Sequence, residues 1–185
     1  MAATTTHLPV GVSPVPPQPS PHASSPSASN TKSWRVPRLL LKVRDVSHEG
    51  AIRYFEATNT HQLLTKAVIG VLSTLYTHGT APLTQRSVTL ILRRMDGVAY
   101  TTGSDLDNDH KEIHISLEYL SRIPEALIKE EIEGVVRHEM VHCWQYDGQG
   151  TAPGGLIEGI ADWVRLKAGF CPPHWKRGGD KWDDG

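Results

Sequence analysis

Two histidines and a glutamate stand together in the motif His138-Glu139-Met140-Val141-His142, an H-E-x-x-H pattern. On a helix, positions i and i+4 lie on one face about one turn apart, so the two imidazoles could bind one zinc ion at roughly 2.0–2.1 Å each. Glu139 lies about 100° round the helix from His138, where its carboxylate could flank the metal without binding it. There it could accept a proton from a water molecule whose pKa the zinc lowers. The motif therefore predicts a zinc site with a general base beside it.

The alternative for this motif is a pair of surface histidines that form hydrogen bonds with solvent or with Glu139. The surrounding sequence favours the metal site. The motif falls in a stretch predicted to be helical, and the apolar Ile132, Val135 and Val136 before it would bury that stretch. Buried polar groups need partners, and a zinc ion would supply one.

The third ligand is expected beyond the glycine-rich loop Asp147–Gly155, because no third histidine follows in H-x-x-G-x-x-H spacing. This loop would let a second helix fold back against the first, with Glu158 in its first turn as the ligand. Asp162 lies four residues further on the same face, and it could accept a hydrogen bond from the free N–H of a metal-bound histidine. The alternatives are a helix N-terminal charge for Glu158 and a surface ion pair with Arg165 for Asp162.

Hydrophobic periodicity predicts the elements that must position these side chains. Strands are expected over four segments, namely Leu39–Val46, Ser87–Arg93, Val98–Thr102 and Glu112–Leu117. Helices are expected from Asn59 or Thr60 to Thr77, over Ser121–Tyr146 in one or two segments, and over Leu156–Ala168. This order is typical of an α+β domain in which helices pack on a small mixed sheet.

Side chains near the motif have expected roles of their own. Trp144 and Trp163 are expected in the core, and Cys143 is expected to be a small buried hydrophobe. A donor for the oxyanion of a hydrolytic reaction stays unassigned. Tyr146, Arg165 and His174 are the candidates near the motif, and core packing or a surface role is the alternative for each.

Length, charge and cysteine content narrow the function classes. The 185 residues are enough for one domain. A formal net charge of −1 disfavours nucleic acid and an anionic membrane surface as partners. No apolar run approaches the roughly eighteen residues that would span a bilayer. The two cysteines, Cys143 and Cys171, are too few for a disulfide framework.

The first 33 residues differ in composition from the remainder. They hold seven prolines, seven serines and one charged residue, Lys32, so we expect a disordered tail followed by a folded domain over residues 34–185. The prolines would break the apolar region of a secretory signal, and no basic region precedes it. The run Pro14–Pro19 matches a PxxP ligand of small adaptor domains, although a solvated tail is the commoner role of such a pattern.

The stretches HEMVHCWQ and GGLIEGIADWVRLKAG resemble the plant basic secretory protein family, zinc metallopeptidases of the gluzincin-like type that also occur in fungi. The resemblance covers roughly residues 37–185 and suggests a fungal-type member. It implies a zincin-like fold in which His138 and His142 bind zinc, Glu139 is the catalytic acid and base, and Glu158 completes the coordination. It also implies that the strand Glu112–Leu117 is an edge strand beside the cleft, the alternative being an ordinary half-buried strand.

The sequence thus predicts a zinc-dependent peptidase that acts on peptide or protein substrates. A non-catalytic binding or defence-associated protein on a zincin scaffold, with a structural metal, is the alternative. A third hypothesis is a protein docked to an adaptor through its proline-rich tail. The two apparently unpaired cysteines and the lack of a visible signal favour a reducing, cytoplasmic setting, whereas plant members of the resembled family are secreted.

Overall fold

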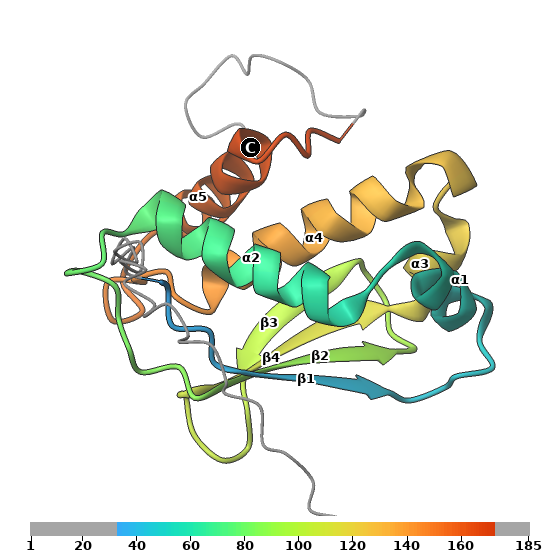
Figure 1. The fold of residues 1–185 in the computed structure, drawn as a ribbon, viewed down its shortest axis with the longest axis horizontal. Helices are drawn as coiled ribbons and strands as arrows, with labels where there is room; N and C mark the ends of the chain where they lie inside the picture. The colour runs from blue at the N-terminus through green and yellow to red at the C-terminus, as the bar shows by residue number, and fades with distance from the viewer. Residues whose placement is uncertain (1–32, 173–185) are drawn as a thin grey trace, which may run out of the picture. The chain divides into compact units, whose positions relative to one another are not determined.

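The computed structural model describes residues 33–172, which form a mixed α+β fold with a four-stranded sheet (Figure 1). The strands are β1 (Arg38–Val43), β2 (Ser87–Arg93), β3 (Ala99–Gly103) and β4 (His110–Ser116). Their order in the sheet is β1-β2-β4-β3, with β1, β2 and β4 parallel and β3 antiparallel to β4. The expected fold class and small mixed sheet are confirmed. The predicted disordered tail and its PxxP motif fall, apart from Ser33, outside the described residues.

Five α-helices accompany the sheet within residues 33–172. They are α1 (Glu49–Ala57), α2 (Thr60–Leu75), α3 (Leu117–Arg122), α4 (Ile128–His142) and α5 (Gly154–Lys167), with a 3-10 turn at Glu125–Leu127. The sequence did not predict α1. This helix has only nine residues, and its N-cap is the imidazole of His48 rather than one of the usual short polar side chains. None of the described helices is long and apolar enough to cross a membrane.

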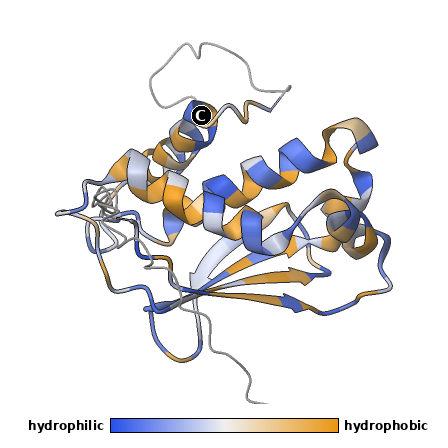
Figure 2. Cartoon of the chain, in the orientation of Figure 1, coloured by the Kyte–Doolittle hydropathy of each residue, from blue (hydrophilic) through white to orange (hydrophobic). Residues whose placement is uncertain are grey.

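The core lies between the sheet and the helices, which cover one face of the sheet (Figure 1). Alternate residues of the two central strands, such as Leu90, Leu92, Ile113 and Ile115, point into this layer and are fully buried. The strands β1 and β2 are largely apolar, whereas β3 is pale in the hydropathy colouring of Figure 2. The polar strand β3 is therefore suited to the margin of the sheet.

The structure corrects the expected place of the strand around residues 112–117. This strand, β4, lies inside the sheet between β2 and β3, so it is not an edge strand. The edge beside the C-terminal part of α4 is formed by β3, which pairs with β4 alone among the described strands. The resemblance alone implied an edge strand, and this expectation was wrong. The alternation of polar and apolar residues could not have tested it, because alternation reports which face of a strand is buried and not which strands are its neighbours.

The helix α5 is held on α4 by a largely buried ion pair. Arg165 of α5 is buried, with 8% of its surface exposed. Its Nη2 atom donates to both carboxylate oxygens of Glu131 on α4, each at 3.0 Å. The hydroxyl of Tyr119 in α3 donates to the same carboxylate at 2.6 Å. Arg165 Nε also donates to the backbone oxygen of Phe170, which follows α5. Arg165 is therefore engaged with Glu131, and Asp162, for which the sequence left a pair with Arg165 open, lies 2.7 Å from Nδ1 of His138.

A glycine makes room for this guanidinium. A Cβ atom on Gly134, one helical turn after Glu131, would lie 2.8 Å from Arg165 Nε and 3.0 Å from Nη2. Arg165 cannot move aside without losing its bonds to Glu131 and Phe170. Gly134 is therefore required for α5 to pack closely on α4.

We expect Gly134→Ala to lower the free energy of unfolding by about 1–3 kcal/mol, because the added methyl group overpacks the interface between α4 and α5. This loss would outweigh the roughly 1 kcal/mol that alanine gains over glycine in a helix. Urea titration followed by circular dichroism measures the change. The matched control is Gly159→Ala in α5, where a Cβ meets nothing within 4 Å and a gain of about 0.5–1 kcal/mol is expected. Equal stabilisation by both substitutions would contradict the packing argument.

Candidate metal centre

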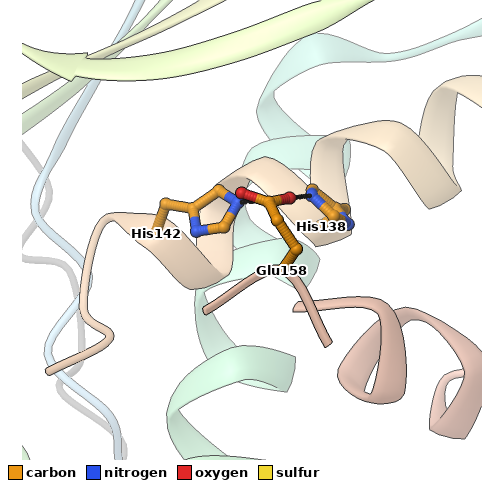
Figure 3. Close-up of side chains that lie close together, drawn as sticks. All are labelled: His138, His142 and Glu158. Carbon is orange, nitrogen blue, oxygen red and sulfur yellow. Dashed lines mark hydrogen bonds and ion pairs between the residues drawn. The ribbon is translucent and has the colours of Figure 1, made fainter. Parts of the chain in front are cut away.

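Two histidines of α4 and one glutamate of α5 converge on a single point (Figure 3). The Nε2 atoms of His138 and His142 lie 3.2 Å apart, one helical turn from each other. The Oε2 atom of Glu158 lies 3.0 Å from Nε2 of His138 and 3.7 Å from Nε2 of His142. The structure thus brings together the three side chains that the sequence predicted as metal ligands.

Hydrogen bonds at the other ring nitrogen fix how each imidazole is oriented. Nδ1 of His138 donates to Oδ1 of Asp162 at 2.7 Å, and Nδ1 of His142 donates to Oε1 of Gln145 at 3.1 Å. The amide nitrogen of Gln145 donates to the backbone oxygen of Ile157 at 2.9 Å. A carbonyl oxygen only accepts, so the amide of Gln145 must turn its own oxygen toward His142. In the neutral form of each ring these bonds place the proton on Nδ1 and leave a lone pair at Nε2.

This arrangement fits a bound metal ion. In this tautomer two Nε2 atoms and one carboxylate oxygen turn lone pairs toward one another, and a metal ion or a proton on Nε2 would join them. Ligand atoms of a tetrahedral zinc site with bonds of 2.0–2.1 Å stand about 3.3–3.4 Å apart. The separations between the side chains, 3.0, 3.2 and 3.7 Å, lie on both sides of this value. Two nitrogen donors and one oxygen donor suit zinc and leave a fourth position open.

Glu139 lies beside this point, and its carboxylate is not one of the three converging groups. Its side chain is buried, and Oγ1 of Thr101 on β3 lies 2.7 Å from its Oε2 and 2.9 Å from its backbone oxygen. Burial raises the pKa of the Glu139 carboxyl, while the hydrogen bond from Thr101 and the nearby imidazoles act in the opposite direction. The carboxylate is thus held by the edge strand, with Oε1 left without a hydrogen-bond partner among the described residues.

The site opens into a cleft of about 750 Å³ between the sheet edge and the ends of α4 and α5. Glu139, His142 and Glu158 line it from the helices. Tyr100 and Thr101 line it from β3. A volume of this size is typical of a ligand or substrate site. The same cleft is lined by the edge of the sheet and by two of the converging side chains.

Two residues of the site escaped the sequence analysis. Gln145 stands in the motif-bearing stretch HEMVHCWQ, and its position three residues after His142 was a usable signal, because i and i+3 are neighbours at a helix end. Thr101 carried no such signal. Its contact with Glu139 joins residues 38 positions apart, and only the antiparallel pairing of β3 with β4 places it there.

Other expectations are corrected by the structure. Glu158 is the fifth residue of α5, which begins at Gly154, so it lies in the second turn and not in the first. Trp163 was expected in the core and is 49% exposed, with the Lys167 ammonium 4.8 Å above its ring. The start of α5 came earlier than predicted, and Trp163 lies on the outer side of this helix, which rests on the protein along one face only.

Among the suggested oxyanion donors, Tyr146 lines the cleft and is 74% exposed. Arg165 is engaged with Glu131, and His174 lies outside the described residues. Cys143 and Trp144 are buried in the core, as expected.

The chain belongs to the BSP family, described as a peptidase of plants and bacteria, because the family model matches residues 36–185, most of its length. The resemblance to basic secretory proteins is thereby confirmed. No curated protein and no solved structure matches the chain. The family's description identifies its members as peptidases, which supports cleavage of peptide bonds as the activity.

The hydrogen bond from His142 to Gln145 can be tested without any assay of activity. In metal-free protein at a pH where the imidazoles are neutral, nitrogen NMR should show His142 protonated on Nδ1, because Gln145 supplies the acceptor. Gln145→Leu removes the acceptor and should shift His142 toward the other tautomer. Gln145→Glu keeps an acceptor and should preserve the Nδ1 proton. An unchanged tautomer in the leucine variant would refute the assigned role of Gln145.

Proposed function

We propose that the protein is a zinc-dependent peptidase whose metal is held by His138, His142 and Glu158. The observation that carries the proposal is the convergence of three lone pairs, from two imidazoles and one carboxylate, on one point beside a buried glutamate. Membership of a family of peptidases agrees with it. The zincin-like character of the fold, with the H-E-x-x-H helix at its centre, is part of this proposal.

The residues of the chain divide the chemical work between them. When bound, zinc supplies a Lewis acid that activates water and polarises the scissile carbonyl. Glu139 accepts the proton of the attacking water at Oε1 and passes it to the leaving nitrogen, while Thr101 holds Oε2 in place. The burial that raises the pKa of Glu139 makes it a stronger base than a solvated carboxylate. Asp162 and Gln145 keep both imidazoles in the tautomer that binds metal.

The substrate in this proposal is an extended peptide lying along β3. The outer edge of β3 has no strand partner among the described residues, and Tyr100 and Thr101 of this strand line the cleft. Backbone groups on such an edge can pair with a peptide as an additional strand. The scissile bond would then lie next to Glu139, which is fixed to the same strand through Thr101.

Glu139→Gln should retain zinc and lose peptide hydrolysis by a factor of about 10² to 10⁴, because the amide cannot accept the proton. The measurement is turnover of a mixed peptide library by zinc-loaded full-length protein, with zinc content determined on the same sample. Glu130→Gln, an exposed change on the same helix, should leave turnover unaltered. Retained turnover in Glu139→Gln would refute the assigned base. A zinc-loaded wild type that leaves all peptides uncut would favour a binding protein with a structural metal.

The purified chain should bind about one zinc ion, and removal of a ligand should weaken this binding. Competition with a chelator of known affinity measures it. Glu158→Ala should lose at least as much affinity as Asp162→Asn, for which about 10- to 100-fold is expected because only the support of His138 is weakened. Glu56→Ala on α1 is the control for a lost surface charge. Unchanged affinity in Glu158→Ala would exclude this carboxylate as a ligand.

A further inference from the structure

Among residues 33–172, one lysine lines the cleft from the sheet. Lys111 on β4 lines the cleft together with Cys143 and Trp144 at the end of α4. It stands two residues before Ile113, whose side chain is buried under the helices, so both side chains leave the same face of the strand. Its ammonium group is therefore on the helix side of the sheet, where the proposed zinc site also lies.

The ammonium group is held in place without being neutralised. Nζ of Lys111 donates to Oδ1 of Asn108 at 2.6 Å, and no carboxylate of the described residues forms an ion pair with it. An amide can orient an ammonium group, but it leaves the charge uncompensated. Lys42, on the opposite face of the sheet, differs in this respect because it pairs with Glu112 at 3.6 Å.

Most carboxylates along the cleft are committed elsewhere. Glu158 is directed at the two histidines of the proposed metal site, Glu139 accepts a hydrogen bond from Thr101, and Asp109 forms an ion pair with Arg86 at 3.8 Å. Asp147 also lines the cleft, but it belongs to the loop after α4 and not to the sheet. The positive charge of Lys111 is thus available to a ligand that enters the cleft along β3 and β4.

The register between β3 and β4 gives the distance along the sheet between Lys111 and Thr101, the residue that holds Glu139. Thr101, which holds Glu139, is paired with Ile113, and Lys111 is paired with Gly103 one row further along the same face. Adjacent rows on one face of a strand are about 7 Å apart, which is also the spacing of every second side chain in an extended peptide. A peptide paired with the outer edge of β3 would also lie two strand spacings, about 10 Å, from β4, and Gly103 between them has no side chain. A long acidic side chain one or two residues from a scissile bond at Glu139 would therefore lie within reach of the long side chain of Lys111.

We propose that Lys111 is a specificity-determining residue, which binds a carboxylate of the peptide substrate about two residues from the scissile bond. This inference rests on the proposed peptidase function. The carboxylate could belong to an aspartate or glutamate side chain or to the C-terminus of a short peptide, and the same charge-assisted hydrogen bond would recognise either. The preference should weaken as salt is added, because the cleft is open to solvent.

The test compares peptides that differ only by glutamate or glutamine at each position around the cleaved bond. With blocked termini, wild type should cleave one glutamate peptide with kcat/KM about tenfold higher than its glutamine partner, mainly through a lower KM. If the C-terminus is the recognised group, the preference should instead appear only in peptides with a free terminal carboxylate. Lys111→Met should abolish the preference, and Lys111→Glu should reverse it, so that a third peptide with lysine at the same position is cleaved best. Lys42→Met, the same change on the opposite face, should keep it.

Binding to the zinc-loaded Glu139→Gln protein provides a second measurement that does not depend on turnover. Calorimetry should show tighter binding of the acidic peptide than of its glutamine partner, with the difference lost when Lys111→Met is added. Cleavage or binding with no preference for a carboxylate, or a preference that survives Lys111→Met, would overturn the inference while leaving the peptidase proposal intact. Absence of cleavage together with a Lys111-dependent preference in binding would overturn the peptidase proposal alone.

Discussion

The packing of α5 against α4 is the constraint on which the rest of the site depends, because the converging side chains come from both helices. The two histidines of one helix can offer only two ligands to the proposed metal, so a third would have to come from beyond the glycine-rich loop, where Glu158 lies. The buried ion pair between Arg165 and Glu131 holds the helices together on one side. The bonds from Gln145 to the backbone of Ile157 and from His138 to Asp162 hold them near the site itself. Helix packing and ligand orientation are therefore achieved by the same contacts.

The site combines a buried carboxylate, Glu139, with three converging side chains of which the two histidines are mostly buried and Glu158 is largely exposed. Burial raises the pKa of Glu139, so its ionised form is less favourable than that of a solvated carboxylate. Groups that would be unfavourable in an empty core are typical of functional sites, where a ligand supplies the missing partner. The Nδ1 hydrogen bonds strengthen this arrangement, since they prevent the rings from turning their protons inward.

The edge strand β3 connects this chemistry to the cleft. Its composition is polar, which suits a margin of the sheet that stays accessible, and Thr101 fixes Glu139 to it. A peptide that pairs with β3 would thus be placed relative to Glu139 by the same strand that holds this carboxylate. The neighbouring strand β4 contributes an uncompensated ammonium group one row away, so the sheet can provide both register and charge recognition.

Local patterns in the sequence determined the α+β class, the approximate bounds of α2, β2 and α5, and the histidine pair, because helix geometry alone places i and i+4 on one face. The residues around the motif also indicated the peptidase family to which the chain belongs. The order of the strands, the partner of Arg165 and the contact of Thr101 with Glu139 were decided only by the tertiary structure. Each of these joins residues distant in the chain, and polar or apolar alternation cannot say which strand lies at an edge. The separation between Glu158 and the histidines likewise depends on how two helices dock, which no local pattern encodes.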